Sequence, residues 1–364
     1  MKLDLKKAAS TALIGFLLVG ILASVNAIAP AKSLWKHSFF IVSGLIFCWI
    51  TTAKWWSTDR CFWALRILLF ISFILSLYGI YQFLEYIFAG TWNTGIRITS
   101  FTKNPNSLAK FLLPFIPVAC ILAIDSKKLL TKNYYFAVTL AMIIALIVTQ
   151  SRGAWGALIV SLVLIAYLMR SIKSALWICI PLFAGLAILP GNAAIARIKT
   201  IFDWTLLSNA ERLHIWDAAL KMIKNNPLIG IGLNHYELHY PSYKSPSGYF
   251  ETFGHAHNTF INIAVETGLL GAILFMAFLL IILYRIFKEN NLDNYAGGIS
   301  IGLGIGTIST LFYGLVEYNF NNELQILLFF VLLGLAERIT CDNKDILNRQ
   351  CKVDNRNICR VTNK

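Results

Sequence analysis

The sequence predicts an all-α membrane protein, a polytopic helical bundle of about ten transmembrane helices with one large outer loop. Of its 364 residues, 57% are hydrophobic and only 14% are charged, with a mean hydropathy of +0.64. A soluble domain carries roughly 25% charged residues. The 25 Phe, 14 Tyr and 10 Trp suit the aromatic belts that flank a bilayer. Apolar runs of spanning length recur along the chain, which favours one bundle over soluble domains.

The order of these apolar runs gives the predicted helices. A spanning helix needs roughly 17–25 apolar residues. The predicted segments are 11–29, 38–53, 62–89, 107–124, 134–149, 153–169, 174–190, 258–284, 296–316 and 323–337. The first could instead be a signal peptide, because Lys2, Lys6 and Lys7 precede it. Pro30 directly follows its small residues and disfavours cleavage there, so we interpret it as a helix.

The distribution of basic residues predicts the orientation. The net charge is +14, and most of the 32 Lys and Arg residues fall in segments that are cytoplasmic if the N-terminus is inside. This explains the charge without nucleic acid, which we do not expect as a partner. Both ends are then cytoplasmic. The predicted organisation is helices one to seven in 1–190, a periplasmic loop at 191–257, helices eight to ten in 258–337, and a basic cytoplasmic tail at 338–364.

The loop at 191–257 is the segment that resembles a soluble protein. Ser208 and Glu211 have the spacing of a capping box, and Asn225-Asn226-Pro227 would stop the helix that follows. Apolar residues recur at helical spacing between them, at Leu213, Trp216, Leu220 and Ile223. We therefore predict an amphipathic helix that lies on the bundle or on the bilayer surface.

Histidines and cysteines give little support for a metal site. His235 and His239 flank Glu237, but this is not the H-E-x-x-H order of zinc proteases. Tyrosines and prolines surround them, which favours a loop packed by aromatic side chains. None of the seven cysteines falls in the outer loop, so no disulfide framework is expected there. We predict no metal.

Three polar clusters precede helices that run inward from the outer face. They are Lys103-Asn104-Pro105-Asn106, Ser151-Arg152-Gly153 and His255-Ala256-His257-Asn258. Helix N-termini present unpaired N–H groups and the positive end of the helix dipole, so they favour phosphate. With Arg97, Arg152 and Arg212 nearby, these three ends would suit a pyrophosphate. Each cluster also has a structural interpretation: a turn and helix cap for the first, an interface anchor for the second and a capping histidine, His257, for the third, while Arg212 could simply face solvent.

The same residues resemble the O-antigen ligase family, which shares its outer-loop region with O-antigen polymerases and bacterial O-linked oligosaccharyltransferases. The segments that carry the resemblance are RITSFTKNPNSLAKFLLP, TQSRGAWGAL, ERLHIWDAALKMIKNNPLIGIGL and HAHNTFINIAVETGLLG. The last holds a His-Asn followed by nine residues and Gly-x-x-Gly, from His257 to Gly271. The resemblance runs from about residue 96 to 275, with a weaker echo in EYNFNNELQ at 317–325. The family's Arg-x-x-x-Leu pattern is altered here. The residue four positions after Arg212 is Trp216, and the residue four positions after Arg152 is Gly156, where the pattern has Leu.

The resemblance implies a GT-C-like glycosyltransferase in the inner (cytoplasmic) membrane, with its active site facing the periplasm. The donor would be a glycan on undecaprenyl pyrophosphate and the acceptor the lipid A core, as in lipopolysaccharide biosynthesis. The reaction would need no metal or other cofactor and would invert the anomeric carbon. His257 is the predicted base, with Arg152 and Arg212 catalytic at the pyrophosphate. The predicted substrate-binding residues are Arg97, Lys103, Asn106, His255, Asn258 and Glu266.

Other functions stay open at this point. Within the family, a polymerase would use a second lipid-linked glycan as acceptor, and an oligosaccharyltransferase would use protein Ser or Thr. From another class, a membrane transporter would show inverted repeats and broken helices near mid-membrane. The polar clusters instead lie at one face, and Gly298, Gly302, Gly304 and Gly306 more simply indicate close helix packing.

Overall fold

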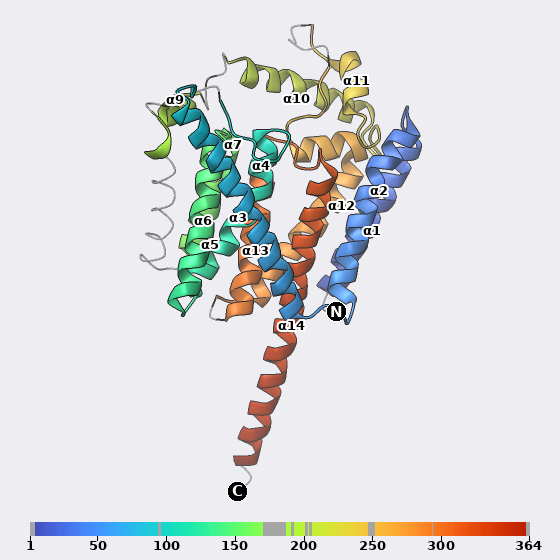
Figure 1. Ribbon diagram of the computed structural model, residues 1–364. Helices are drawn as coiled ribbons and strands as arrows, with labels where there is room; N and C mark the ends of the chain where they lie inside the picture. Colours follow the sequence, from blue (N-terminus) through green and yellow to red (C-terminus); the bar gives the residue numbers. More distant parts are fainter. Residues whose placement is uncertain are drawn as a thin grey trace.

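The protein is a bundle of long helices capped at one end by shorter ones (Figure 1). The computed structural model describes residues 4–93, 96–169, 187–190, 193–200, 203, 206–246, 252–292 and 294–361. Within these residues there are helices and no strands, and nine helical segments are long and apolar enough to cross a membrane. The prediction of an all-α polytopic membrane protein is confirmed. Most of the predicted helix 174–190 lies outside the described residues.

The membrane-spanning helices follow the predicted order. Their bounds are α1 Leu5–Val25, α2 Pro30–Thr52, α3 Thr58–Phe88, α4 Pro105–Leu112, α5 Ile116–Asp125, α6 Leu129–Val148, α7 Arg152–Met169, α12 Thr259–Glu289, α13 Tyr295–Tyr313 and α14 Glu323–Val361. The predicted helix 107–124 is in fact two helices, because Pro114 cannot continue the hydrogen-bond ladder. The predicted tail at 338–364 continues α14 as helix as far as Val361. Its polar composition marks the end of the apolar stretch and not the end of the helix.

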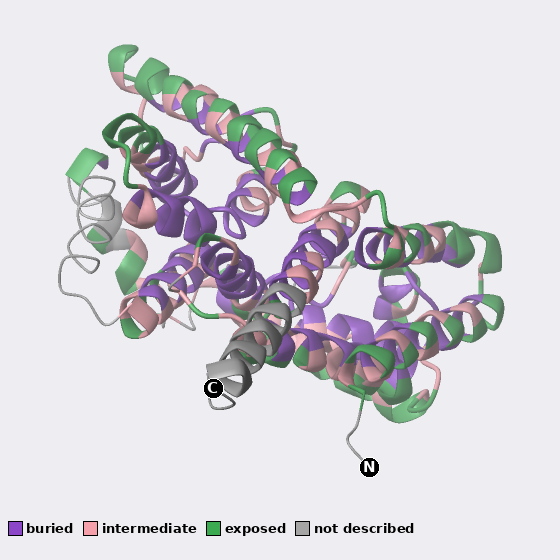
Figure 2. Ribbon diagram, turned by 90° about the horizontal axis from the view of Figure 1, so that it is seen from below, coloured by how far each residue is buried: buried purple, intermediate pink, exposed green. Residues whose placement is uncertain are grey.

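The core lies between the spanning helices, and apolar side chains also cover their outer surface. Seen from below, buried residues gather between the helices and exposed residues form the rim (Figure 2). Phe16 of α1, Phe40 of α2 and Phe275 of α12 are among the most buried side chains, and the Phe16 ring lies 5.0 Å from that of Phe275. Large apolar residues such as Leu45 and Ile273 are more than half exposed. Exposed apolar surface of this extent suits a lipid environment.

Glycines on α13 allow close packing of α5. An added Cβ would lie 2.3 Å from the Pro114 carbonyl oxygen at Gly306 and 3.1 Å from Val118 Cα at Gly302. The interpretation of these glycines as packing positions is therefore confirmed. They bring the α4–α5 break against α13, so α4 ends beside the loop that follows α13.

Three shorter helices form the cap: α9 Ala193–Lys199, α10 Leu207–Asn225 and α11 Tyr236–Tyr243. They lie at the opposite end of the bundle from the N- and C-termini (Figure 1). The cap has its own apolar core, built from Ile215, Ala218, Met222, Tyr236 and Tyr240. His235 is buried with Nδ1 against the Leu233 carbonyl and Nε2 accepting from Ala29 N, which agrees with a packed aromatic loop.

One detail predicted for the cap is wrong. Helix α10 begins at Leu207 with Leu206 as its N-cap residue, so Ser208 lies inside the helix and not at the cap position. Glu211 is instead buried and accepts a hydrogen bond from the Tyr240 hydroxyl. The buried face carries Ile215, Ala218, Ala219 and Met222, while Leu213 and Leu220 are 48% and 60% exposed. Of the predicted apolar positions, Trp216 and Ile223 pack against this core, whereas Leu213 and Leu220 lie on the exposed side of α10.

A break within α12 joins the cap to the bundle. Gly268 has φ +69°, and a Cβ there would lie 2.2 Å from the Leu228 carbonyl oxygen. The segment 227–232 runs along this break, with Ile231 N donating to Val265 O and Leu269 N to Pro227 O. Only glycine combines this backbone with such a close neighbour. The upper half of α12 is therefore held against the outer segment.

Candidate active site

The three predicted helix N-termini do converge. The Asn104 side chain caps α4 and the Asn258 side chain caps α12. Asn106, in the first turn of α4, accepts hydrogen bonds at Oδ1 from Arg97 Nη2 (2.8 Å) and from Ser151 Oγ (3.1 Å). Ser151 Oγ also lies 3.0 Å from the Tyr313 hydroxyl. These contacts join α4, the start of α7 and the end of α13 in one polar cluster.

Four arginines line a cavity of about 300 Å³ at this cluster: Arg97, Arg152, Arg197 and Arg212. Arg97 Nε is anchored to the Thr149 carbonyl oxygen, and Arg197 Nε to Gln150 Oε1 (2.8 Å). Burial and the neighbouring guanidinium of Arg197 lower the pKa of Arg97. Among the described residues that line the cavity, Glu317 is the one acid. Such an excess of positive charge favours a multiply charged anion.

Arg197 was not predicted as a site residue. It lies in α9, on the predicted outer side, where basic residues run against the topological bias. Burial lowers the pKa of Arg197 as well. The topological bias against outer basic residues could have indicated Arg197. The segment 191–257 holds several basic residues, however, and the sequence does not show which of them lines the cavity.

An apolar cavity of about 550 Å³ adjoins the arginines. Arg152, Gly153, Arg212 and Val316 line both cavities. The other lining residues come mainly from α7 and α13 and are mostly apolar, including Trp155, Ile159 and Phe312. Gly153 permits this arrangement, because a Cβ there would lie 2.4 Å from Val316 Cγ2. The arrangement can hold a molecule with an apolar chain and an anionic group.

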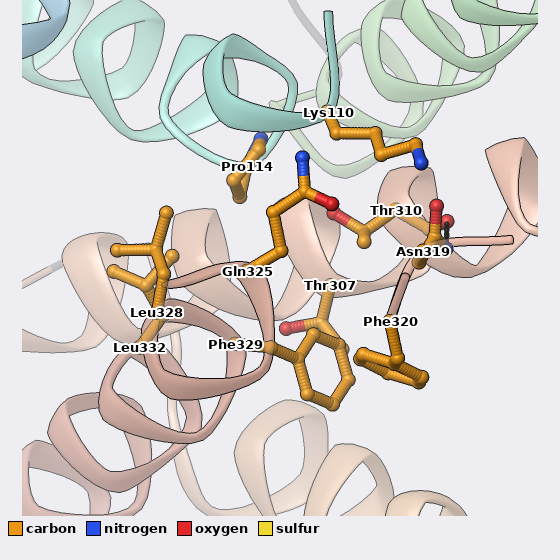
Figure 3. Close-up of a pocket in the computed structure, with 10 residues that line it drawn as sticks. All are labelled: Lys110, Pro114, Thr307, Thr310, Asn319, Phe320, Gln325, Leu328, Phe329 and Leu332. Carbon is orange, nitrogen blue, oxygen red and sulfur yellow. Dashed lines mark hydrogen bonds between the residues drawn. The ribbon is translucent and has the colours of Figure 1, made fainter. Parts of the chain in front are cut away.

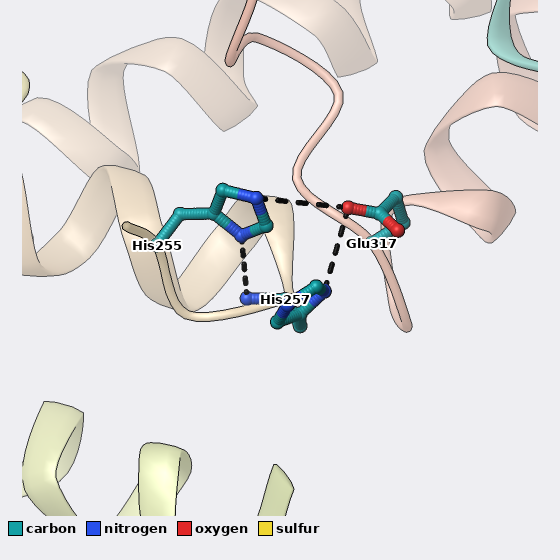
Figure 4. Close-up of side chains that lie close together, drawn as sticks. All are labelled: His255, His257 and Glu317. Carbon is teal, nitrogen blue, oxygen red and sulfur yellow. Dashed lines mark hydrogen bonds and ion pairs between the residues drawn. The ribbon is translucent and has the colours of Figure 1, made fainter. Parts of the chain in front are cut away.

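A third cavity, of about 160 Å³, lies on the other side and contains the histidines. Arg97, Asn106 and Glu317 line both this cavity and the arginine cavity. His257 Nδ1 lies 3.4 Å from Glu317 Oε1, and His255 Nε2 lies 3.9 Å from the same oxygen (Figure 4). The loops that carry these groups are joined, since Thr259 Oγ1 donates to the Glu317 carbonyl and Thr259 N to that of Gly314.

Lys110 forms the floor beneath Glu317. Its Nζ donates to the Tyr318 carbonyl oxygen (2.6 Å) and to Asn321 Oδ1 (3.1 Å), and it lies 3.7 Å from Glu317 Oε1. Below it is a small cavity lined by Thr307, Thr310, Asn319 and Gln325, among others (Figure 3). Burial alone would raise the pKa of Glu317, but His257 and the Lys110 ammonium outweigh burial and hold that pKa well below its usual range. Glu317 is therefore an anion.

The two histidines are not equivalent. His255 Nδ1 accepts from the backbone N–H of His257 (3.2 Å), which leaves its proton on Nε2, facing Glu317. Burial and His257 lower the pKa of His255 to about 3, so this ring is neutral. His257 is also in a strained backbone conformation, with φ +46°. With Nδ1 toward Glu317, its Nε2 is the ring nitrogen left for a ligand. The geometry thus favours His257 over His255 as a base.

The comparison with known protein families matches this region. Residues 137–276 match the model of the family described as O-Antigen ligase. That range holds three of the four cavity arginines, Arg152, Arg197 and Arg212, and both cavity histidines, His255 and His257; Arg97 precedes it. This stretch of the chain is therefore similar to the O-antigen ligase family, and the likeness supports a lipid-linked glycan transferase.

One curated relative shows the same likeness. The ComP-specific O-oligosaccharyltransferase of Acinetobacter baylyi is 26% identical over 252 residues. The match covers 63% of this chain and 43% of that relative, so the chain spans less than half of the length of the relative.

The O-antigen ligase signature has a structural basis in this chain. Its His-Asn lies at the start of α12 and its Gly-x-x-Gly begins at the Gly268 break, so the motif spans the upper half of α12. One end of the motif therefore places His257 at its cavity, and the other end lets the segment 227–232 approach the α12 backbone.

Three predicted substrate-binding residues of this chain lie outside the cavities. Lys103 is exposed and is not among the residues that line them. Asn258 caps α12 and donates to the Leu315 carbonyl oxygen. Glu266 is buried, accepting from Asn234 N and from the Tyr318 hydroxyl. Asn258 and Glu266 thus hold the loops that surround the site. Arg97, Asn106, Arg152, Arg212, His255 and His257 are brought to the cavities as expected.

One group of side chains could hold a metal. Donor atoms of His255, His257 and Glu317 lie within 4.8 Å of one another, as three ligands of a divalent ion would. The Lys110 ammonium, 3.7 Å from the same carboxylate oxygen, would repel such an ion. The arrangement fits an ion-paired carboxylate better than a metal centre.

Proposed function

We propose that this protein transfers a glycan from undecaprenyl pyrophosphate to the lipid A core at the outer face of the inner membrane. The observation that carries the proposal is the order of the three cavities. The apolar cavity, the four arginines and His257 lie in series, which is the order of lipid, pyrophosphate and sugar in such a donor.

The arginines supply the main stabilisation of charge. Guanidinium groups stay protonated and match phosphate oxygens with two parallel N–H donors. Arg152 and Arg212 line both the apolar cavity and the arginine cavity, so they lie where a prenyl chain meets its pyrophosphate. Preorganised charge at the departing group is usually the largest contribution to rate.

The reaction is one displacement at the anomeric carbon. The acceptor oxygen forms the new glycosidic bond while the bond from that carbon to the phosphate oxygen breaks. The electron pair goes to undecaprenyl pyrophosphate, and the acceptor proton goes to His257 Nε2. Attack opposite to the leaving group inverts the configuration, and the step uses no metal or nucleotide.

A second acceptor has support from the comparison. The relative from Acinetobacter baylyi is named as an oligosaccharyltransferase specific for the protein ComP. With the same donor, a protein hydroxyl could replace the sugar hydroxyl of the lipid A core. A polymerase would place another lipid-linked glycan there.

Deletion of the gene, followed by gel analysis of glycolipids, tests these assignments. A ligase predicts loss of long polysaccharide from the lipid A core while the undecaprenyl-linked polymer accumulates. A single repeat left on the core would indicate a polymerase. Normal lipopolysaccharide with unglycosylated protein would indicate the oligosaccharyltransferase.

Complementation with His257→Ala tests the base. We expect transfer to fall by about 10²–10⁴-fold, the usual contribution of a positioned acid or base. The matched control is His214→Ala, since His214 lies in α10 and is not among the residues lining the cavities. Near-normal transfer by His257→Ala would show that the base has been assigned to the wrong residue.

A further inference from the structure

Glu317 lines both the arginine cavity and the histidine cavity, yet neither the sequence nor the family comparison assigned it a role. It lies in the loop between α13 and α14 and is 3% exposed. Its Oε2 accepts from Asn106 Nδ2 (2.7 Å), and its Oε1 accepts from the backbone N–H of Tyr318 (3.2 Å). Oε1 also faces the two histidines (Figure 4), and it lies 3.7 Å from Lys110 Nζ. So many partners on one loop carboxylate point to a role in the site.

We propose that Glu317 is the positioning residue for His257, holding Nδ1–H toward itself so that Nε2 faces the acceptor hydroxyl. This rests on the proposed function, in which His257 is the base. The carboxylate acts through the ring and does not touch the substrate.

The tautomer of His257 is what Glu317 decides. A neutral imidazole carries one proton, and Nε2 can accept only when that proton is on Nδ1. Nδ1 is buried and makes no hydrogen bond within the described part of the chain, and the Glu317 carboxylate faces it at 3.4 Å. A carboxylate there also stabilises the imidazolium that forms when the acceptor proton arrives. The contact can shorten once the ring is charged, since ionised pairs bond at shorter distances.

The same carboxylate links the base to the arginine cavity. Asn106 donates to Glu317 through Nδ2 and accepts from Arg97 through Oδ1. The amide therefore joins an arginine at the proposed pyrophosphate site to the carboxylate behind the base. Movement of Arg97 toward a bound anion would shift Asn106 and, through its amide, the Glu317 carboxylate.

Several charged groups face His257 and fix the sign of the pH effect. Glu317 favours the protonated ring. Lys110 from α4 and Arg97 from the segment before α4 oppose it, while His255 on the same loop is neutral. Glu317→Gln leaves the two cations unopposed beside the ring, and they disfavour a positive charge there.

The test measures transfer by the full-length protein in liposomes containing an undecaprenyl-pyrophosphate-linked oligosaccharide, as a function of pH. For Glu317→Gln we expect kcat to fall on the order of 10²-fold, within the range for a positioned acid or base. The acidic limb of the kcat/KM profile should also move to lower pH. Glu237→Gln is the matched control, because Glu237 is an exposed acid of α11, and it should change neither quantity.

Glu317→Asp separates positioning from folding. It keeps the charge but withdraws it by about one C–C bond, roughly 1.5 Å. We expect kcat to fall about 10-fold while the acidic limb stays at its original pH. This variant tests the proposal even if Glu317→Gln does not fold.

Two results would overturn the proposal. One is a Glu317→Gln protein with normal kcat, and the other is reduced kcat with an unmoved acidic limb, as a purely structural role would give. His257→Ala is measured beside them. If His257→Ala is active, the base assignment fails; if it is inactive while Glu317→Gln has normal kcat, only the role of Glu317 fails.

Discussion

Single side chains of this protein have roles that depend on which neighbour they face. Arg197 and Lys199 lie two residues apart on the short helix α9. Arg197 turns toward Gln150 and lines the arginine cavity, whereas Lys199 is exposed. Substituting each residue in turn therefore compares the loss of a positive charge at the cavity with the loss of a positive charge outside it.

Arg197→Gln should weaken donor binding. Hydrogen bonds to charged groups contribute about 1.5–3 kcal/mol, so we expect the KM for the lipid-linked donor to rise roughly 10- to 100-fold. Steady-state kinetics with Lys199→Gln as control measures this. Equal effects of the two substitutions would mean that only the general positive field matters.

The limits of prediction are also clearest at single residues. His257 and Arg152 were predicted because they stand where inward-running helices begin at the outer face. Arg212 was predicted because an arginine on the outer side runs against the topological bias. Glu317 was not, although the segment at 317–325 resembled the family. An acid beside a spanning helix is ordinary at a membrane surface, and the burial of this one depends on Lys110 and Asn106, which lie some 200 residues away in the sequence.

At the scale of helices, α12 combines two functions across one break. Its first residues place His257, and Gly268 lets the outer segment 227–232 approach the helix backbone. Hydropathy predicted one continuous helix from 258 to 284. It could not show the break, because the residues on both sides of Gly268 are helix formers or apolar.

Gly268→Ala should destabilise the protein. A non-glycine residue at φ +69° and ψ 176°, a region occupied essentially by glycine, costs about 1–3 kcal/mol, and the contact with the Leu228 carbonyl adds to that cost. We therefore expect a lower midpoint of thermal unfolding in detergent. Gly254→Ala is the control, since a Cβ at Gly254 has no atom within 4 Å and its φ is not positive. Unchanged thermal stability of Gly268→Ala would refute the role given to the break.

Helix boundaries and helix faces were predicted unequally well. The spanning helices were found because an apolar run of bilayer length seldom occurs outside a membrane helix. The face of α10 was predicted in part, because Trp216 and Ile223 pack inward while Leu213 and Leu220 do not, and only the packed partners decide between them. The basic tail was predicted from composition alone, which does not show that α14 continues through it as helix.

For the whole molecule, the cap lies at one end and both termini lie at the other (Figure 1). Arg197 and Arg212 of the cap helices line the arginine cavity, so this cavity lies at the capped end. The arrangement agrees with a positive inner side and an outer active site, which stays a prediction. A cavity at the capped end also differs from the mid-membrane site that a transporter needs.

Cysteine labelling tests the orientation. Leu238→Cys places a thiol on the exposed side of α11, and Lys127→Cys places one between α5 and α6. With a membrane-impermeant maleimide on spheroplasts, we expect the first to react beyond the background of the unaltered chain. The second should react only after permeabilisation. The reverse pattern would place the active site in the cytoplasm.

The apolar cavity beside Arg152 and Arg212 has a consequence for kinetics. A donor whose chain lies in that cavity meets the protein by diffusion within the membrane plane. Its effective concentration is then a mole fraction among lipids and not an amount per volume of buffer. Dilution of the suspension leaves this quantity unchanged, whereas added lipid lowers it. The proposed transfer would therefore depend on the composition of the membrane around the protein.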